Sequence, residues 1–280
     1  MLYYANADKD NADVFILGIP FDSTTTFNPG SRFGPDAIRQ VTDVLESYSM
    51  ILDKDIIDIK VCDLGNISHY SNPKFMINET YNKVKEILNK NKFIVCLGGE
   101  HTITYPVVKA YKEKFENLAV IQFDAHSDLR ENFEFEKFSH ACVMNLIGKE
   151  IGFENLYQFG IRSMDKEELK FAKKTNFYPL HKYKSKDIIK ILNNLNLKEK
   201  EIYLTIDIDV LDPSCAPGTG TPEPCGLTTN EFFEIFYELR KFNIVGMDIV
   251  EINPMIDISG ITAITGAKIL REGILSFVKY

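Results

Sequence analysis

Short apolar runs alternate with longer amphipathic segments along almost the whole chain, and this alternation limits the fold more than any other feature. Near-continuous apolar runs of strand length are typical of parallel strands buried on both faces, with helices in the connections. The predicted strands cover 13–20, 56–65, 92–99, 118–124, 155–162, 177–183, 201–209 and 243–252. Helices are predicted between them, over 34–49, 76–90 and 102–115 among others. The sequence therefore predicts an α/β fold, with one domain over residues 1–280.

Composition restricts the partners of such a domain. The 280 residues carry a formal net charge of −8, which argues against nucleic acid or an anionic membrane as the main partner and fits cations better. No apolar run approaches the roughly 20 residues of a membrane-spanning helix, and the first residues lack the features of a signal peptide. The five cysteines are scattered, with no Cys-x-x-Cys pair, as is typical of reduced thiols. We therefore predict a cytoplasmic protein.

Carboxylate and imidazole side chains follow three of the predicted strands, in the stretches "LGGEH" (97–101), "DAHSD" (124–128) and "DID" (207–209). In extended backbone, residues two apart point to the same face, so the side chains within each of the last two groups should converge. Ligands of open α/β sheets bind beyond the carboxyl ends of the strands, so the three groups should share one crevice. The six candidate ligands are His101, Asp124, His126, Asp128, Asp207 and Asp209.

Two histidines and four aspartates are more than one catalytic Zn²⁺ uses, because such sites usually take three protein ligands. Four carboxylates nearly balance two dications and suit hard or borderline ions such as Mn²⁺, held about 3.5–4 Å apart. Without cations the four carboxylates would repel one another. A single Asp after a strand is more often a cap or turn residue, but the three groups together favour a metal site.

Longer motifs surround these residues: "GGEH", "DAHSD", "SHA", "GIRS", "DIDVLDPSCAPGTGTPEPCGLT", "DIVEINP" and, near the N-terminus, "PGSRFGPDAIR". In their order and spacing they resemble the ureohydrolase family of arginases and agmatinases. The resemblance implies a three-layer α/β/α fold around an eight-stranded parallel sheet, with two Mn²⁺ per subunit. It implies that one ion is held by His101, Asp124, Asp128 and Asp207, and the other by His126, Asp124, Asp207 and Asp209.

The resemblance also implies a reaction, the hydrolysis of a guanidine by attack of a metal-bridging hydroxide on the guanidinium carbon. His140 in "KFSHACVM" matches the family's proton shuttle. Glu251 in "DIVEINP" matches the carboxylate that pairs with the substrate guanidinium. Asp128 is expected to accept a hydrogen bond from the tetrahedral intermediate. Catalysis is thus assigned to His140, Glu251 and Asp128.

Four other polar residues are weaker candidates. Glu100, beside His101, is a carboxylate that could orient a metal-bound imidazole. Asp212 in "VLDP" is expected to shape its loop rather than bind metal. His69 and His181 are expected in exposed segments outside the site.

The loop 129–140, "LRENFEFEKFSH", bears on the substrate. Glu131, Glu134 and Glu136 raise the local negative potential and would suit a substrate that ends in an amine. The loop lacks the Ser-Gly-Asn stretch of arginases, and the chain most resembles the bacterial agmatinases, which convert agmatine to putrescine and urea in polyamine biosynthesis. Arg130 leaves 4-guanidinobutyrate open, because a guanidinium can bind a substrate carboxylate. Arginase and other guanidine hydrolases of the family also stay open.

Two function classes outside the family are weaker alternatives. A two-metal phosphatase would need Lys or Arg side chains at the metal edge, and the three motifs offer mainly carboxylates. A non-catalytic metal-binding protein would be expected to lack a ligand or the shuttle, and all of these are present. For the assembly, the family resemblance implies a homotrimer or homohexamer.

Overall fold

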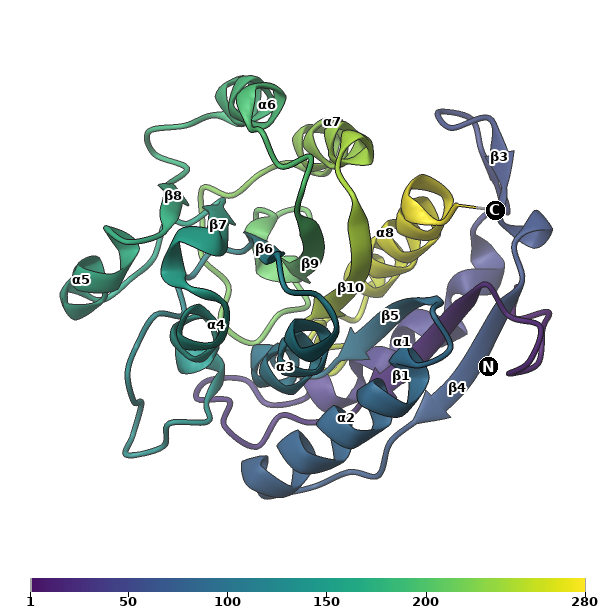
Figure 1. The fold of residues 1–280 in the computed structure, drawn as a ribbon, viewed down its shortest axis with the longest axis horizontal. Coiled ribbons are helices and arrows are strands. Elements are labelled where there is room, and N and C mark those ends of the chain that lie inside the picture. The colour runs from purple at the N-terminus through teal and green to yellow at the C-terminus, as the bar shows by residue number, and fades with distance from the viewer. Residues whose placement is uncertain (1, 280) are drawn as a thin grey trace.

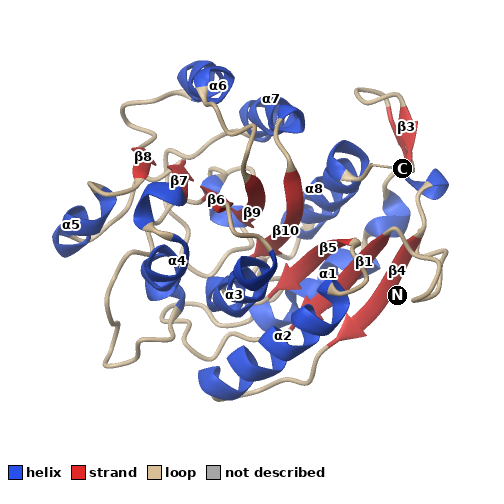
Figure 2. Ribbon diagram, in the orientation of Figure 1, coloured by secondary structure: helices blue, strands red, loops and turns tan. Residues whose placement is uncertain are grey.

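The computed structural model describes residues 2–279, in which an eight-stranded parallel sheet runs through the middle of the molecule (Figure 2). Every neighbouring pair of its strands is parallel. In spatial order the strands are β4 (Val61–Asn66), β1 (Val14–Ile19), β5 (Phe93–Gly98), β10 (Ile244–Val250), β9 (Glu201–Asp207), β6 (Leu118–Phe123), β7 (Leu156–Phe159) and β8 (Asn176–Tyr178). The predicted α/β fold with an eight-stranded parallel sheet is confirmed.

Helices cover both faces of the sheet and complete three layers (Figure 1). One face packs against α1 (Gly34–Gln40), α6 (Ser185–Asn194), α7 (Thr229–Glu238) and α8 (Ile261–Phe277), and the other against α2 (Pro73–Leu88), α3 (Thr104–Lys114), α4 (Val143–Ile151) and α5 (Leu169–Ala172). In β1, Val14 and Ile16 enter the first core, whereas Phe15 and Leu17 enter the second. Burial on both faces explains why the strands read as continuous apolar runs. No helix within residues 2–279 is long and apolar enough to cross a membrane.

The helix predicted over 34–49 is too long. α1 ends at Gln40, and just beyond it the hydroxyl of Thr42 donates to the carbonyl of Arg39 at 2.8 Å. Such side-chain bonds to the backbone compete with helix propagation. A small antiparallel hairpin follows, made of β2 (Tyr48–Ser49) and β3 (Lys54–Asp55).

Three predicted strands are shorter than expected, each for a local reason. The segment 155–162 forms a strand only as far as Phe159, because the next residue, Gly160, has a φ of 90° and turns the chain out of the sheet. The segment 56–65 begins with a 3-10 turn, because the side chain of Asp55 accepts a hydrogen bond from the backbone N–H of Ile57. The segment 177–183 contributes little to the sheet, since β8 ends at Tyr178. The next residue is Pro179, which has no N–H to continue the ladder.

A buried ion pair joins α1 to β4. The guanidinium of Arg39 donates to both carboxylate oxygens of Asp63, each at 2.9 Å, and the two side chains are 5% and 3% exposed. Burial by itself would raise the pKa of Asp63, but the bonds and charge of Arg39 outweigh it and lower that pKa. The pair ties an outer strand to the helix layer.

Candidate metal centre and active site

The predicted ligands gather at the carboxyl edge of the sheet, beyond four neighbouring central strands. His101 begins a 3-10 turn after β5, Asp124 follows β6, Asp207 is the last residue of β9, and Glu251 follows β10. Parallel strands bring these ends to one edge although the residues are up to 150 positions apart in sequence.

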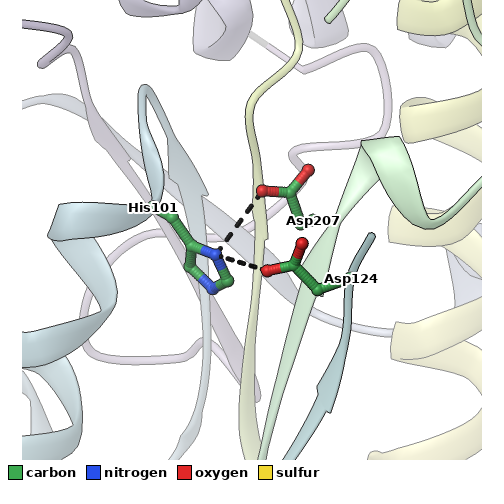
Figure 3. Close-up of side chains that lie close together, drawn as sticks. All are labelled: His101, Asp124 and Asp207. Atoms are coloured by element: carbon green, nitrogen blue, oxygen red, sulfur yellow. Dashed lines mark ion pairs between the residues drawn. The ribbon is translucent and has the colours of Figure 1, made fainter. Parts of the chain in front are cut away.

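The imidazole of His101 faces three carboxylates, and Figure 3 shows two of them, Asp124 and Asp207. Its Nδ1 lies 3.0 Å from Asp124, 3.0 Å from Asp128 and 3.4 Å from Asp207, measured to one oxygen of each. This buried nitrogen satisfies hydrogen-bond geometry with none of them. A buried imidazole nitrogen that faces several carboxylate oxygens without a hydrogen bond to any of them is the arrangement that a cation would complete.

A chain of hydrogen bonds fixes the other side of this ring. His101 Nε2 lies 2.9 Å from the hydroxyl of Thr205, and that hydroxyl donates to Asp248 at 2.6 Å. Because the single hydroxyl proton of Thr205 is used on Asp248, its oxygen accepts from Nε2–H and Nδ1 keeps the lone pair. The sequence analysis missed both residues. Thr205 lies two residues before Asp207 on the same strand, and Asp248 is its neighbour in the register of β9 and β10.

Two groups of candidate ligands meet at Asp124. The first ligand group is His101, Asp124 and Asp207, and the second ligand group is Asp124, His126 and Asp209; within each, the ligand atoms lie within 4.8 Å of one another. In the second group, His126 Nδ1 is 2.9 Å from Asp209 and 3.7 Å from Asp124. Asp124 thus belongs to both groups, in the position that the family resemblance implies for a bridging ligand.

The backbone that carries these ligands differs from the extended one predicted. β6 ends at Phe123, and Asp128 has a φ of 53°, in the left-handed region. Asp209 lies in a 3-10 turn after β9, and its N–H donates to the side chain of Asp207 at 2.9 Å. The carboxylates therefore converge because the loops fold back over the sheet edge, and not because of strand alternation.

The carboxylates of this centre are almost fully buried, which makes their charge costly. Burial and the charge of Asp124 raise the pKa of Asp128 to about 7, and burial followed by repulsion from Asp209 raises that of Asp207 well above its usual range. The neighbouring carboxylates outweigh burial at His101 and raise its pKa. Protons thus compensate the negative charge when cations do not. The donor set of imidazole nitrogens and carboxylate oxygens fits two hard or borderline dications such as Mn²⁺.

A cavity of about 280 Å³ opens over the centre, and all three predicted catalytic side chains, those of His140, Glu251 and Asp128, line it. Glu251 has a φ of 64° and accepts a hydrogen bond from the backbone N–H of His101 at 2.9 Å. Burial and then the charge of Glu100 raise the pKa of Glu251. His140 begins a 3-10 turn before α4, and burial lowers its pKa to about 4. The structure therefore brings together the whole predicted set.

The structure also places the four weaker candidates from the sequence. Asp212 accepts from the backbone N–H groups of Ser214 and Gly226 at 3.0 Å each, so it shapes its loop as predicted. Neither His69 nor His181 lines the cavity over the centre. Glu100 accepts hydrogen bonds from the hydroxyls of Thr24, Thr25 and Thr102 and has none to the His101 ring, contrary to the orienting role predicted for it.

The outer part of the cavity differs from the prediction. Glu131 points to Lys170, with 2.5 Å between Nζ and the carboxylate, and neither Glu134 nor Glu136 lines this cavity. The carboxylates that do line it beyond the centre are Asp165 and Glu168. Sequence carried a signal for this pair, because "DKEE" (165–168) is a capping-box pattern, and the box is formed.

Arg130 lies between these two carboxylates. Its guanidinium is 3.4 Å from Asp165 and 3.8 Å from Glu168, and it stacks over the ring of Phe133 with 4.9 Å to the centroid. Glu168 is further fixed by Ser127 and Leu129, which donate to it at 2.5 and 2.8 Å. The positive charge of Arg130 is therefore already compensated within the protein.

Comparison with known proteins places this fold and centre in a family. The model of the Arginase family matches residues 12–276, so the chain belongs to the arginase family, a family of metalloenzymes. It is 42% identical over 275 residues to a protein named agmatinase from Bacillus subtilis, covering 96% of this chain and 93% of that one.

Solved structures agree. The agmatine ureohydrolase of Thermoplasma volcanium matches with a TM-score of 0.92 and 32% identity, over 98% of this chain and 93% of that chain. A putative agmatinase from Clostridium difficile matches with a TM-score of 0.90 and 40% identity, over 97% and 99% of the two chains. The resemblance stated from the motifs is thereby confirmed.

Proposed function

We propose that this protein hydrolyses agmatine to putrescine and urea at a centre of two Mn²⁺ ions. It is a hydrolase of linear amidines, as its agmatinase relatives indicate. The observation that carries the proposal is that both ligand groups share the buried Asp124, while ligands of each group, Asp207 and Asp209, line one cavity. The proposed ligands are His101, Asp124, Asp128 and Asp207 for one ion, and His126, Asp124, Asp207 and Asp209 for the other.

When bound, the two dications supply a water nucleophile of lowered pKa and balance the charge of the four aspartates. The protein positions the substrate against this centre. Glu251, whose carboxylate is held by the N–H of His101, can pair with the planar guanidinium in two parallel hydrogen bonds. Asp128, on the same cavity wall, can accept a hydrogen bond from an amino group of the reacting carbon. The positive guanidinium itself favours the ionised form of both carboxylates.

His140 is the group that can move the proton. Since burial lowers its pKa to about 4, the ring is neutral near pH 7 and can accept a proton before it donates one. The leaving amine requires that proton, because an amide-like anion is a poor leaving group. The ring of Phe133 packs edge-on against His140, with 5.9 Å between centroids, and shields it on one side.

The charges of the outer cavity favour a substrate that ends in an amine. Asp165 and Glu168 carry two negative charges against the single positive charge of Arg130. A distal ammonium group, as in agmatine, would be attracted to this excess, whereas the carboxylate of 4-guanidinobutyrate would have to displace both acidic partners of Arg130. Asp165 and Glu168 thus take the role that the sequence analysis gave to the glutamates of 129–140.

The test is urea release by Mn²⁺-loaded protein with agmatine, 4-guanidinobutyrate and L-arginine in parallel. We expect agmatine to be preferred and Asp165→Asn to raise its KM. Glu131→Gln, which changes a carboxylate outside the cavity, is the matched control and should leave KM unchanged. Preference for 4-guanidinobutyrate would show that Arg130 binds the substrate carboxylate. No urea from any guanidine would refute the proposal.

Further parts of the proposal rest on the chain and its relatives. Residues 1–280 act as one domain, and the assembly is a homotrimer or homohexamer, as the family resemblance implies. All five cysteines are free, which supports a cytoplasmic location. A two-metal phosphatase is disfavoured because the cation lining the cavity, Arg130, is held by acidic partners.

A further inference from the structure

Glu100 is a fully buried carboxylate whose partners are threonines. One of its oxygens accepts from the hydroxyls of Thr24 and Thr102, the latter at 2.5 Å. The other accepts from the backbone N–H of Thr24 at 2.8 Å and from the hydroxyl of Thr25 at 3.3 Å. Thr24 is therefore held through both its main chain and its side chain by one buried group.

The hydroxyl of Thr24 connects Glu100 to His140. Its oxygen accepts from the backbone N–H of His140 at 3.2 Å and lies 3.2 Å from Nδ1 of the same residue. A hydroxyl has one proton, and that of Thr24 is donated to Glu100. Toward the ring, Thr24 can consequently only accept, so Nδ1 must carry a hydrogen.

We propose that Thr24, anchored by Glu100, is a positioning residue that holds His140 in the Nδ1–H tautomer. The lone pair then lies on Nε2, which makes no hydrogen bond to any residue in 2–279. The inference rests on the proposed function insofar as His140 is the proton carrier there. It goes beyond that function because it assigns a role to two residues that do not line the cavity over the centre.

The proton then has a defined route. As the C–O bond to the guanidinium carbon forms, the attacking water gives up a proton, and Nε2 of His140 accepts it. The resulting imidazolium keeps its Nδ1–H bonded to Thr24, close to the carboxylate of Glu100. As the C–N bond breaks, Nε2–H donates the proton to the leaving amine and the ring returns to its neutral form. The remaining O–H proton is lost to solvent as the C=O bond of urea forms, and the released amine takes up one proton from solvent to become an ammonium. A carboxylate that orients a histidine through a hydrogen bond is an established catalytic device, and here a hydroxyl stands between the two.

Ser139 offers the alternative partner. Its hydroxyl lies 3.4 Å from the same Nδ1 and is also buried. Thr24 is favoured because its contact is shorter and because it also binds the backbone N–H of His140. Ser139→Ala therefore serves as the matched control for substitutions of Thr24.

The decisive measurement is the tautomer of His140 in ¹⁵N-histidine-labelled protein loaded with diamagnetic Zn²⁺. A long-range ¹H–¹⁵N spectrum distinguishes protonated from unprotonated ring nitrogens, and the His140 signals are assigned by their loss in His140→Asn. We expect protonated Nδ1 and unprotonated Nε2 in the wild type, Thr24→Ser and Ser139→Ala. Thr24→Val, which keeps the side-chain shape without the hydroxyl, should shift His140 to a mixture of tautomers.

Kinetics of the Mn²⁺-loaded variants give the second readout. Thr24→Val should lower kcat by about 10–100-fold, as is typical when a group behind a catalytic residue is removed, with unchanged KM and metal content. Its melting temperature should fall, because the buried Glu100 loses one hydrogen-bond donor. A protonated Nε2 in the wild type, an unchanged tautomer in Thr24→Val, or loss of the tautomer in Ser139→Ala would each overturn the proposal. The spectrum needs no substrate. A failure to release urea with the tautomer pattern intact would therefore refute the proposed function alone.

Discussion

Asp124→Asn removes the one carboxylate that both ligand groups share, so it should weaken the binding of two ions at once. In the wild type, Asp124 accepts from the backbone N–H of His126 and from the side-chain amide of Gln122, each at 2.6 Å. An amide at this position turns one of its NH₂ hydrogens toward one of these donors. The variant therefore loses a negative charge. It also gains a buried NH₂ group that faces one of the two N–H donors, so neither of these donors has an acceptor.

The size of the effect follows from the distances. Ligand atoms within 4.8 Å of one another place an enclosed cation within about 4 Å of the Asp124 carboxylate. At that distance, one pair of unit charges contributes about 4 kcal/mol at an effective dielectric constant of 20. Removing the buried carboxylate also removes its desolvation cost, which offsets part of the loss. We expect a net cost of about 3–4 kcal/mol per ion, or roughly 10²–10³-fold weaker binding.

The assay is Mn²⁺ titration by calorimetry, with metal content measured after gel filtration. Asp209→Asn belongs only to the second ligand group and should weaken one ion more than the other. Asp212→Asn lies in the same "DIDVLDP" motif but caps a loop, so its Mn²⁺ affinities should equal those of the wild type. Two ions bound by Asp124→Asn with wild-type affinity would refute the shared-ligand centre.

Three further perturbations test other parts of the structure. His140→Asn should keep both ions but slow turnover by about 10²–10⁴-fold. Burial lowers the pKa of His140 to about 4, so protonation of His140 should not produce an acid limb near pH 6.5 in the wild-type profile of kcat/KM against pH. Asp63→Asn should cost about 3–5 kcal/mol in urea unfolding at pH 7, because it leaves the buried Arg39 with only the exposed Asp36 as an acidic partner. The pKa of Asp63 is lowered in the folded protein, so the stabilisation by the ion pair is present above about pH 4 and is lost as pH falls through the folded pKa. If Asp63→Asn lowered the free energy of unfolding equally at pH 7 and at pH 3, the ion pair would not be the source of the stabilisation. Gly99→Ala should reduce Mn²⁺ content and activity, since a Cβ there would lie 1.8 Å from the carbonyl oxygen of Phe21 and displace the turn that carries the metal ligands. Normal Mn²⁺ content in Gly99→Ala would argue against this role of the turn.

The strands could be predicted because both of their faces are buried. β1, β5, β6 and β10 are all apolar at nearly every position, and such runs leave few alternatives to a parallel sheet. The hairpin β2–β3 could not be predicted, because strands of two residues have no measurable periodicity. Helix ends were likewise decided by single hydrogen bonds, as at Thr42.

The chemical identity of the centre could also be read from the sequence. Spaced Asp and His residues after three strands predict a cation site by their donor chemistry alone, and all six lie together in the structure. Their convergence was predicted for the wrong reason, since Asp128 and Asp209 lie in turns and not in strands.

The sequence by itself predicted the parallel α/β sheet and the six proposed ligands, because both depend on local composition and spacing, and its motifs indicated the arginase family by resemblance. Tertiary structure alone decided which residues form hydrogen bonds to the side chains of the site. Thr205 and Asp248 meet only through the register of two neighbouring strands. Thr24 reaches His140, 116 positions away, through loops that sequence periodicity does not describe. The charge around Arg130 was decided in the same way, since its acidic partners come from the turn after β7 and not from its own loop. Hydrogen bonds between distant segments depend on distances that exist only once the chain has folded.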